Sequence, residues 1–90
     1  MQFRIGNGID FHQLGTGTPL VIGGVSIPFT KGSKGHSDGD ALFHAIVDAV
    51  LGALAQGDIG KHFPSNNPNL KNLNSKLFLE HACKLIKENK

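Results

Sequence analysis

The segment 41–55 is almost entirely apolar and constrains the fold more than any other part of the chain. Between Asp40 and Ala55 the polar side chains are Asp40, His44 and Asp48. Residues four apart lie above one another on a helix, so these three form a narrow polar stripe on an apolar cylinder. Such a helix belongs in a protein interior, where unpartnered carboxylates and imidazoles are costly. The stripe therefore requires hydrogen bonds, ion pairs or a metal ion.

The segments before this helix predict strands. Residues 3–12 alternate well enough for a strand, in which Gly6 and Gly8 indicate a close backbone approach or a bend. Two short apolar runs at 20–22 and 25–28 flank Gly23-Gly24, which is typical of a two-residue hairpin turn. We expect Asp10 and His12, two residues apart, to project from the same face of their strand.

The second half of the chain predicts helices and loops. The apolar helix is expected to begin near Asp38 to Asp40 and to end near Gly57. Residues 57–64 predict a short turn or a single helical turn, and 65–74 have loop composition. A final helix is expected over roughly 75–89, with an apolar stripe at 79, 82, 83 and 86 widened by 78 and 85.

These elements predict one α+β domain over residues 1–90, with a mixed sheet covered by helices on one face. Three strands and two helices leave an open sheet edge and an uncovered apolar surface on both helices. Of 90 residues, 39% are hydrophobic, which suffices for one core and leaves no room for a second domain.

The composition excludes several classes of function. The net charge of +2 arises from the basic residues after position 70, and without Trp, Tyr or an Arg cluster a nucleic-acid surface is not expected. One cysteine permits no internal disulfide, and no apolar run approaches membrane-spanning length. We expect a cytoplasmic bacterial protein or, as the alternative, a mature protein of a plastid-type organelle.

Asp10, His12 and His44 combine one carboxylate with two imidazoles, the donor set of a zinc site with an open fourth position. Asp40 or Asp48, one turn either side of His44, can orient its ring. The alternative is an exposed Asp10–His12 pair on the strand and a core histidine hydrogen-bonded to Asp48. Spacing alone favours this alternative, because such a pair is common by chance, and the buried polar stripe raises the support for a metal ion.

Two further segments are candidates for substrate contacts. His36 and Ser37 precede the apolar helix, where free backbone N–H groups favour an anion, or they are simply a loop residue and a helix cap. Asp58-Ile59-Gly60 offers a carboxylate and a bare backbone to a polyol, or it is only a helix-terminating turn. His62 and His81 are expected at the surface without convergent partners, and Cys83 is expected to pack in the core.

Four short motifs, taken together and in order, are specific. They are Arg4-Ile5-Gly6-Asn7-Gly8-Ile9-Asp10-Phe11-His12, Ile22-Gly23-Gly24-Val25-Ser26-Ile27-Pro28, His36-Ser37-Asp38-Gly39-Asp40 with His44 and Asp48, and Gly57-Asp58-Ile59-Gly60-Lys61-His62-Phe63-Pro64. Their order and spacing resemble those of the 2-C-methyl-D-erythritol 2,4-cyclodiphosphate synthase family. The resemblance covers essentially all 90 residues.

The resemblance implies roles for individual residues. It makes Asp10, His12 and His44 the zinc ligands, with the open position taking an oxygen of the substrate diphosphate. It implies that His36, as a catalytic residue, and Ser37 hold the reacting phosphate. The implied contacts to the remainder of the substrate are Asp58, Ile59 and Gly60, which hold the methylerythritol unit, and a loop formed by Phe63, Pro64, Ser65, Asn66 and Asn67.

The implied reaction is a lyase-type intramolecular phosphoryl transfer in the non-mevalonate route to isoprenoids. It converts 4-diphosphocytidyl-2-C-methyl-D-erythritol 2-phosphate to 2-C-methyl-D-erythritol 2,4-cyclodiphosphate and CMP. The family is a homotrimer, and Mg²⁺ accompanies the substrate diphosphate.

The sequence departs from the family pattern in two places. Ser65-Asn66-Asn67 is neutral where the family usually carries acidic residues. The family domain also continues past the position of Lys90 with the cytidine pocket and the Mg²⁺ ligand, so the chain resembles its N-terminal portion. Two alternatives are a non-catalytic zinc-binding or oligomerisation module and an unrelated zinc hydrolase that uses Asp10, His12 and His44.

Overall fold

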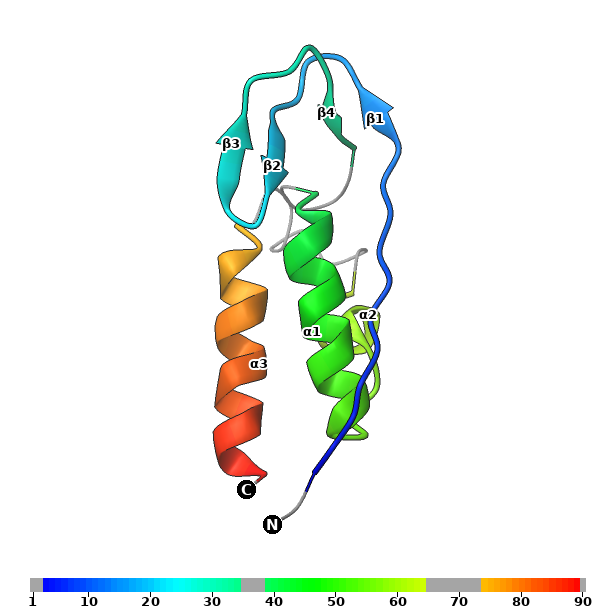
Figure 1. Cartoon of the computed structure of the whole chain (residues 1–90), viewed down its shortest axis with the longest axis vertical. Coiled ribbons are helices and arrows are strands. Elements are labelled where there is room, and N and C mark those ends of the chain that lie inside the picture. Colours follow the sequence, from blue (N-terminus) through cyan, green and yellow to red (C-terminus); the bar gives the residue numbers. More distant parts are fainter. Residues whose placement is uncertain (1–2, 35–38, 65–73, 90) are drawn as a thin grey trace.

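The computed structural model describes residues 3–34, 39–64 and 74–89. Its elements are, in order, β1 (Leu14–Gly15), β2 (Leu20–Ile22), β3 (Val25–Ile27), β4 (Gly32–Ser33), α1 (Ala41–Ala53), α2 (Ile59–His62) and α3 (Lys76–Glu88). Helices α1 and α3 pack side by side and run in the same direction, and the strands gather beyond their N-terminal ends (Figure 1). The expected α+β class is confirmed.

The strands form two separate antiparallel pairs, β1 with β4 and β2 with β3. Leu20 pairs with Ile27 and Ile22 with Val25, so the predicted hairpin is confirmed. Its turn residues Gly23 and Gly24 both have positive φ, 61° and 78°, which the turn of a two-residue hairpin favours. The expected mixed sheet, covered by helices on one face, is wrong for the described ranges, because both ladders are antiparallel and lie at one end of the helix pair.

Residues 3–12 run alongside α1 without pairing to any strand that the structure describes (Figure 1). The strand predicted there is therefore wrong in this respect, because alternation sets which side chains share a face and does not supply a neighbour for the backbone. The predicted close approach is confirmed. A Cβ added to Gly6 would collide with the carbonyl oxygen of Ala49, and one added to Gly8 with that of Ala45.

Helix α1 begins at the predicted place and ends earlier than predicted. Asp40 is its N-cap, and its carboxylate accepts from the Phe43 N–H. At the other end Ala55 adopts a positive φ of 56° and the Gln56 N–H bonds back to the Leu51 carbonyl at 2.8 Å. This is the hydrogen-bond pattern of a Schellman motif, with alanine where glycine is usual. The helix therefore stops before Gly57, which has a positive φ of its own.

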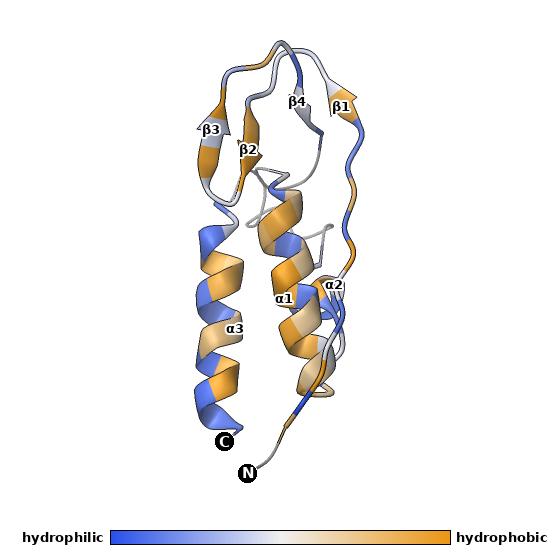
Figure 2. Ribbon diagram, viewed as in Figure 1, coloured by the Kyte–Doolittle hydropathy of each residue, from blue (hydrophilic) through white to orange (hydrophobic). Residues whose placement is uncertain are grey.

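The core lies between α1 and α3. Its fully buried members are Val47 and Leu51 from α1 and Phe78 and Ala82 from α3. Figure 2 shows α1 as mostly hydrophobic and α3 as alternating between hydrophobic and hydrophilic turns. The final helix lies where predicted, but Cys83 and Ile86 from its expected apolar stripe are exposed, so the prediction that Cys83 packs in the core is wrong.

Apolar side chains remain at the surface in large number, as expected. Ile5 and Phe11 are 93% and 87% exposed on the N-terminal segment, and Leu42, Ile46, Leu77 and Ile86 are exposed on the two long helices. An exposed apolar surface of this kind is typical of a face that packs against another protein surface. None of the described helices has the length and hydropathy that crossing a bilayer requires.

The buried Asp40 carboxylate connects the hairpin to α1, and its removal tests that connection. Its oxygens accept from Gly23 N–H at 2.9 Å and Gly24 N–H at 2.7 Å in addition to the helix cap. We predict that Asp40→Ala lowers the free energy of unfolding by about 3 kcal/mol or more, since several donors lose a charged acceptor. Asp58→Ala, which removes the exposed cap of α2, serves as the control and should cost about 1 kcal/mol. Equal losses in urea denaturation would contradict this role of Asp40.

The close approach at Gly8 predicts a second stability difference. Gly8→Ala places a methyl group against the backbone of α1, so we expect a loss of about 1–3 kcal/mol in the free energy of unfolding. Gly52→Ala is the matched control, because no atom lies within 4 Å of the added carbon. Removing a glycine from a helix should stabilise that variant by up to about 1 kcal/mol. If both variants melt like the wild type, residues 3–12 do not pack on α1 as described.

Candidate metal centre

Asp10, His12 and His44 converge, as the metal interpretation and the family resemblance require. Asp10 and His12 lie two residues apart on the extended N-terminal segment, and His12 Nε2 is 2.7 Å from Asp10 Oδ2. His44 enters from the first half of α1, with its Nδ1 3.3 Å from that same oxygen and 3.3 Å from His12 Nε2. Three donor atoms from two segments thus face one another in a small space.

The spacing of these donors fits a metal ion. In a tetrahedral zinc site with bonds of about 2.0–2.2 Å, neighbouring ligand atoms are about 3.3–3.6 Å apart. Both distances that involve His44 match this value. The 2.7 Å separation of His12 and Asp10 is shorter, so these two side chains must separate slightly to share an ion.

Hydrogen bonds on the far side of each imidazole orient its ring, and for His12 they also fix the direction of the lone pair. His12 Nδ1 is 3.2 Å from the Lys34 carbonyl oxygen. A carbonyl only accepts, so Nδ1 carries the proton and a neutral His12 turns the lone pair of Nε2 toward Asp10. His44 Nε2 is 2.7 Å from the Ser75 hydroxyl, which leaves Nδ1 facing the same centre. Ligating histidines are commonly oriented in this way.

The electrostatics of the cluster favour a cation. Asp10 Oδ2 is buried and makes no hydrogen bond with the described residues. It lies 2.7 Å from His12 Nε2, and that nitrogen offers it a lone pair instead of a proton when His12 is neutral. When both imidazoles present lone pairs, these and the carboxylate repel one another, and a divalent ion at their centre removes that repulsion.

On the side away from the cluster, the His44 ring hydrogen-bonds with Ser75 and not with Asp40 or Asp48. Asp40 bonds to the hairpin turn, and Asp48 Oδ1 accepts from the Ile59 N–H at 2.7 Å. The prediction that one of them orients His44 is therefore wrong for the described residues. Sequence reasoning missed Ser75 because a serine before a helix indicates a cap. Here it is fully buried, and its side chain makes no cap hydrogen bond.

The structure describes only some of the candidate substrate residues. His36, Ser37, Ser65, Asn66 and Asn67 lie outside the described residues.

The other candidates lie on or next to α2. Asp58 is exposed and caps α2 by accepting from the Lys61 N–H, while Gly60 and Pro64 are also exposed. Ile59 and Phe63 pack partly on the core, with the Phe63 ring 4.4 Å from that of Phe78. The turn is thus anchored by its apolar side chains and leaves Asp58 and Gly60 accessible.

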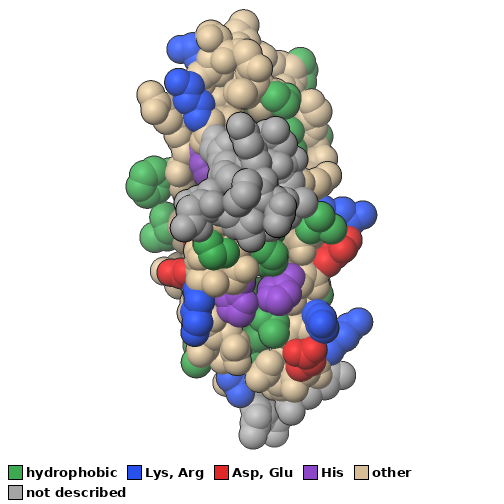
Figure 3. Space-filling view, turned by 180° about the vertical axis from the view of Figure 1, so that it is seen from behind, with side chains coloured by type: hydrophobic (Ala, Val, Ile, Leu, Met, Phe, Trp, Pro, Cys, Tyr) green, Lys and Arg blue, Asp and Glu red, His purple; other side chains and the backbone are tan. Residues whose placement is uncertain are grey.

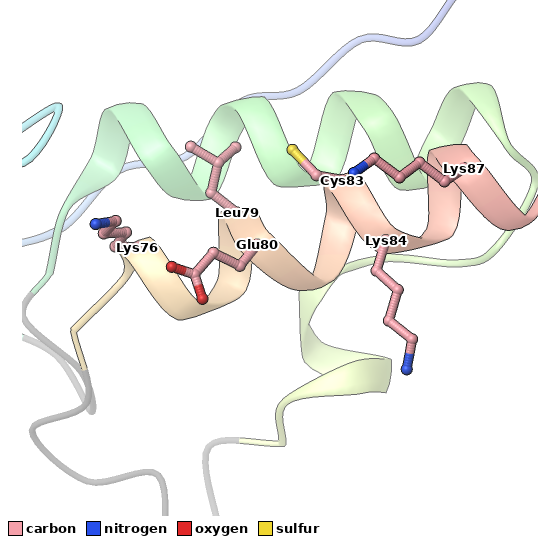
Figure 4. Close-up of a pocket in the computed structure, with 6 residues that line it drawn as sticks. All are labelled: Lys76, Leu79, Glu80, Cys83, Lys84 and Lys87. Atoms are coloured by element: carbon pink, nitrogen blue, oxygen red, sulfur yellow. The ribbon is translucent and has the colours of Figure 1, made fainter.

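Two features outside this centre were not expected from the sequence. His62 and His81 lie in contact, so the prediction that they lack convergent partners is wrong. An open groove also runs along α3 (Figure 4), and its lining residues are Lys76, Leu79, Glu80, Cys83, Lys84 and Lys87. The groove has an apolar floor and basic rims and does not include the metal centre.

Comparison with known proteins identifies a family for this chain. The YgbB family model matches residues 3–90. The chain is 59% identical over 85 residues to the 2-C-methyl-D-erythritol 2,4-cyclodiphosphate synthase of Chlorobium phaeobacteroides, covering 94% of this chain and 54% of the relative. It is 61% identical over 83 residues to the synthase of the same name from Chloroherpeton thalassium, covering 92% and 53%.

A solved structure gives the same result for the fold. It is a 2-C-methyl-D-erythritol 2,4-cyclodiphosphate synthase in a CDP-bound form, and its TM-score is 0.85 at 45% identity. The match covers 94% of this chain and 57% of that one. The chain spans about half the length of the curated relatives it matches, and it corresponds to their N-terminal portion. Together, the family match and these likenesses show that the chain belongs to the YgbB family.

Proposed function

We propose that this chain binds Zn²⁺ through Asp10, His12 and His44 and serves the cyclisation of 4-diphosphocytidyl-2-C-methyl-D-erythritol 2-phosphate to 2-C-methyl-D-erythritol 2,4-cyclodiphosphate with release of CMP. The observation that carries the proposal is the convergence of one carboxylate and two imidazoles. The two imidazole rings are oriented by hydrogen bonds with the Lys34 carbonyl and the Ser75 hydroxyl. The names of the relatives supply the product, and the family resemblance implies the substrate and the release of CMP.

The residues of this chain act by holding and positioning the substrate. A zinc ion, when bound, acts as a Lewis acid on a diphosphate oxygen. His36 and Ser37 are proposed to hold the phosphate on which the reaction takes place. Asp58, Ile59 and Gly60 are proposed to hold the methylerythritol unit, and hydrogen bonding of Ile59 N–H to Asp48 keeps that turn fixed to α1. Phe63, Pro64, Ser65, Asn66 and Asn67 are proposed as a contacting loop.

These proposed roles suit phosphoryl transfer, because its catalysis depends on alignment of the substrate and neutralisation of its charge more than on a covalent bond to the protein. The attacking 2-phosphate is already an anion, so no general base is required. When the protein holds the two phosphates of one molecule in line, the reacting groups are already close and aligned. This lowers the activation free energy of the reaction. The proposal also includes Mg²⁺ bound with the substrate diphosphate, for which this chain offers no assigned ligand.

We also propose that the protein assembles as a homotrimer in the bacterial cytoplasm. The support is the array of exposed apolar side chains on the N-terminal segment, where Phe3, Ile5, Ile9 and Phe11 are each at least 74% exposed. Burying such side chains against another subunit removes apolar area from water, which favours association. Family membership disfavours the unrelated hydrolase, and the activity test below separates the enzyme from a non-catalytic zinc module.

Metal affinity tests the roles of the residues around the cluster. We predict that His44→Ala abolishes binding of Zn²⁺ at this centre and that Ser75→Ala weakens binding there by about 10–100-fold, because the His44 ring loses its orienting hydrogen bond. Asp48→Asn is the matched control, one turn from His44, and should leave the affinity unchanged since an amide oxygen still accepts from Ile59. Competition with a chromogenic chelator measures all three. Full zinc affinity in the Ser75 variant would refute its positioning role.

Product analysis tests the reaction. The full-length protein with Zn²⁺ and Mg²⁺ should release CMP from the diphosphocytidyl substrate and form a cyclic diphosphate, both visible by ³¹P NMR. His44→Ala should lower the rate of CMP release by at least about 100-fold, because the substrate diphosphate loses its Lewis acid. An uncyclised, hydrolysed product would identify a hydrolase, and bound zinc without any CMP would identify a non-catalytic module.

A further inference from the structure

We propose that His62 and His81 form a second metal site, which takes a first-row transition-metal ion such as Cu²⁺, Ni²⁺ or Zn²⁺ through two imidazole nitrogens. His62 is the last residue of α2, and His81 lies near the middle of α3. His81 Nε2 is 3.2 Å from His62 Nδ1. Two residues far apart in sequence thus bring two potential ligand atoms together.

The outer hydrogen bond of His62 determines what it presents to His81. His62 Nε2 is 2.7 Å from the Gln56 carbonyl oxygen, which only accepts, so Nε2 carries the proton. A neutral His62 therefore directs the lone pair of Nδ1 toward His81. The same arrangement holds for His12, whose Nδ1 proton is directed to the Lys34 carbonyl. In both His62 and His12, a backbone carbonyl accepts the proton of one ring nitrogen, which leaves the lone pair of the other nitrogen available as a metal ligand.

The geometry matches that of the first centre. The His62–His81 nitrogens are 3.2 Å apart, and the His12–His44 nitrogens are 3.3 Å apart. Adjacent ligand atoms at about 2.0–2.1 Å from one ion are separated by a similar distance. The two centres are distinct, because the rings of Phe63 and Phe78 lie between His81 and His44.

Packing holds the histidine pair in place and leaves it reachable. The Phe63 ring lies 5.1 Å from that of His81 at an interplanar angle of 82°, an edge-to-face contact that limits the freedom of the imidazole. Both histidines are half-buried. Figure 3 shows two adjoining histidine side chains at the surface, beside hydrophobic, basic and acidic groups. An ion from solvent can therefore reach the pair and complete its coordination with water.

The donor set determines the class of ion. Imidazole suits Zn²⁺, Cu²⁺ and Ni²⁺, whereas Mg²⁺ and Ca²⁺ require oxygen ligands. The only close partner of either imidazole's facing nitrogen, within the described ranges, is the other imidazole. An ion bound there would connect α2 to α3 and so brace the turn that carries Asp58 and Gly60. Without the ion, the same pair makes a simple hydrogen bond, which is the alternative to be tested.

Cu²⁺ titration of the full-length, metal-free protein, followed by electron paramagnetic resonance, tests this site separately from the first. We expect the wild type to bind two equivalents, His44→Ala to bind one with hyperfine structure from two nitrogens, and His81→Gln to bind one. Lys84→Gln, another exposed position on α3, is the matched control and should bind two.

The outcomes are decisive for each centre. Loss of one equivalent in His44→Ala reports on the first centre, and loss in His81→Gln reports on the second, so either proposal can fail alone. If His81→Gln binds as many equivalents as the wild type, the pair is only a hydrogen bond and the proposal is overturned. If circular dichroism shows that His44→Ala is unfolded, the comparison of His81→Gln with the wild type and the Lys84 control still decides.

Discussion

The polar stripe on α1 is the constraint on which the rest of the structure depends. A buried carboxylate or imidazole needs partners, and each member of the stripe takes them from a different part of the chain. Asp40 accepts from the turn of the β2–β3 hairpin, and Asp48 accepts from the first residue of α2. His44, between them, meets Asp10 from the N-terminal segment and Ser75 from the start of α3. One helix thereby collects the hairpin, the N-terminal segment, α2 and α3 around it, and the metal centre lies at the middle of its stripe.

Features that local chemistry determines could be predicted from the sequence. Two consecutive glycines between apolar runs specify a hairpin because both must adopt positive φ. The residue spacing made Asp10, His12 and His44 candidates for convergence, and the resemblance to the synthase family assigned them as one set of ligands. Gly6 and Gly8 also indicated a close approach, since only a residue without a side chain permits the backbone of α1 to come so near.

Features that depend on distant partners or on unusual backbone geometry could not be predicted. Residues 3–12 alternate like a strand, but alternation does not identify a neighbouring strand. Helix α1 ends at an alanine with positive φ, where glycine would have given the signal. Ser75 looks like a helix cap because caps are the common use of serine at that position, and only the fold shows that it faces His44. The contact of His62 with His81 likewise arises because α2 and α3 both pack on α1, which brings the end of α2 within side-chain reach of α3.

X-ray absorption at the zinc edge, on protein loaded with one equivalent of Zn²⁺, tests the first centre most directly. The donors assembled by α1 and the N-terminal segment predict two imidazole nitrogens and at least one oxygen at about 2.0–2.2 Å, with no sulfur. In protein that also carries His81→Gln, so that the His62–His81 pair cannot take the ion, the multiple-scattering pattern of two imidazoles should disappear when His44→Ala is added. A spectrum with a sulfur ligand, with oxygen ligands only, or unchanged by that substitution would contradict the assignment of the ion to Asp10, His12 and His44.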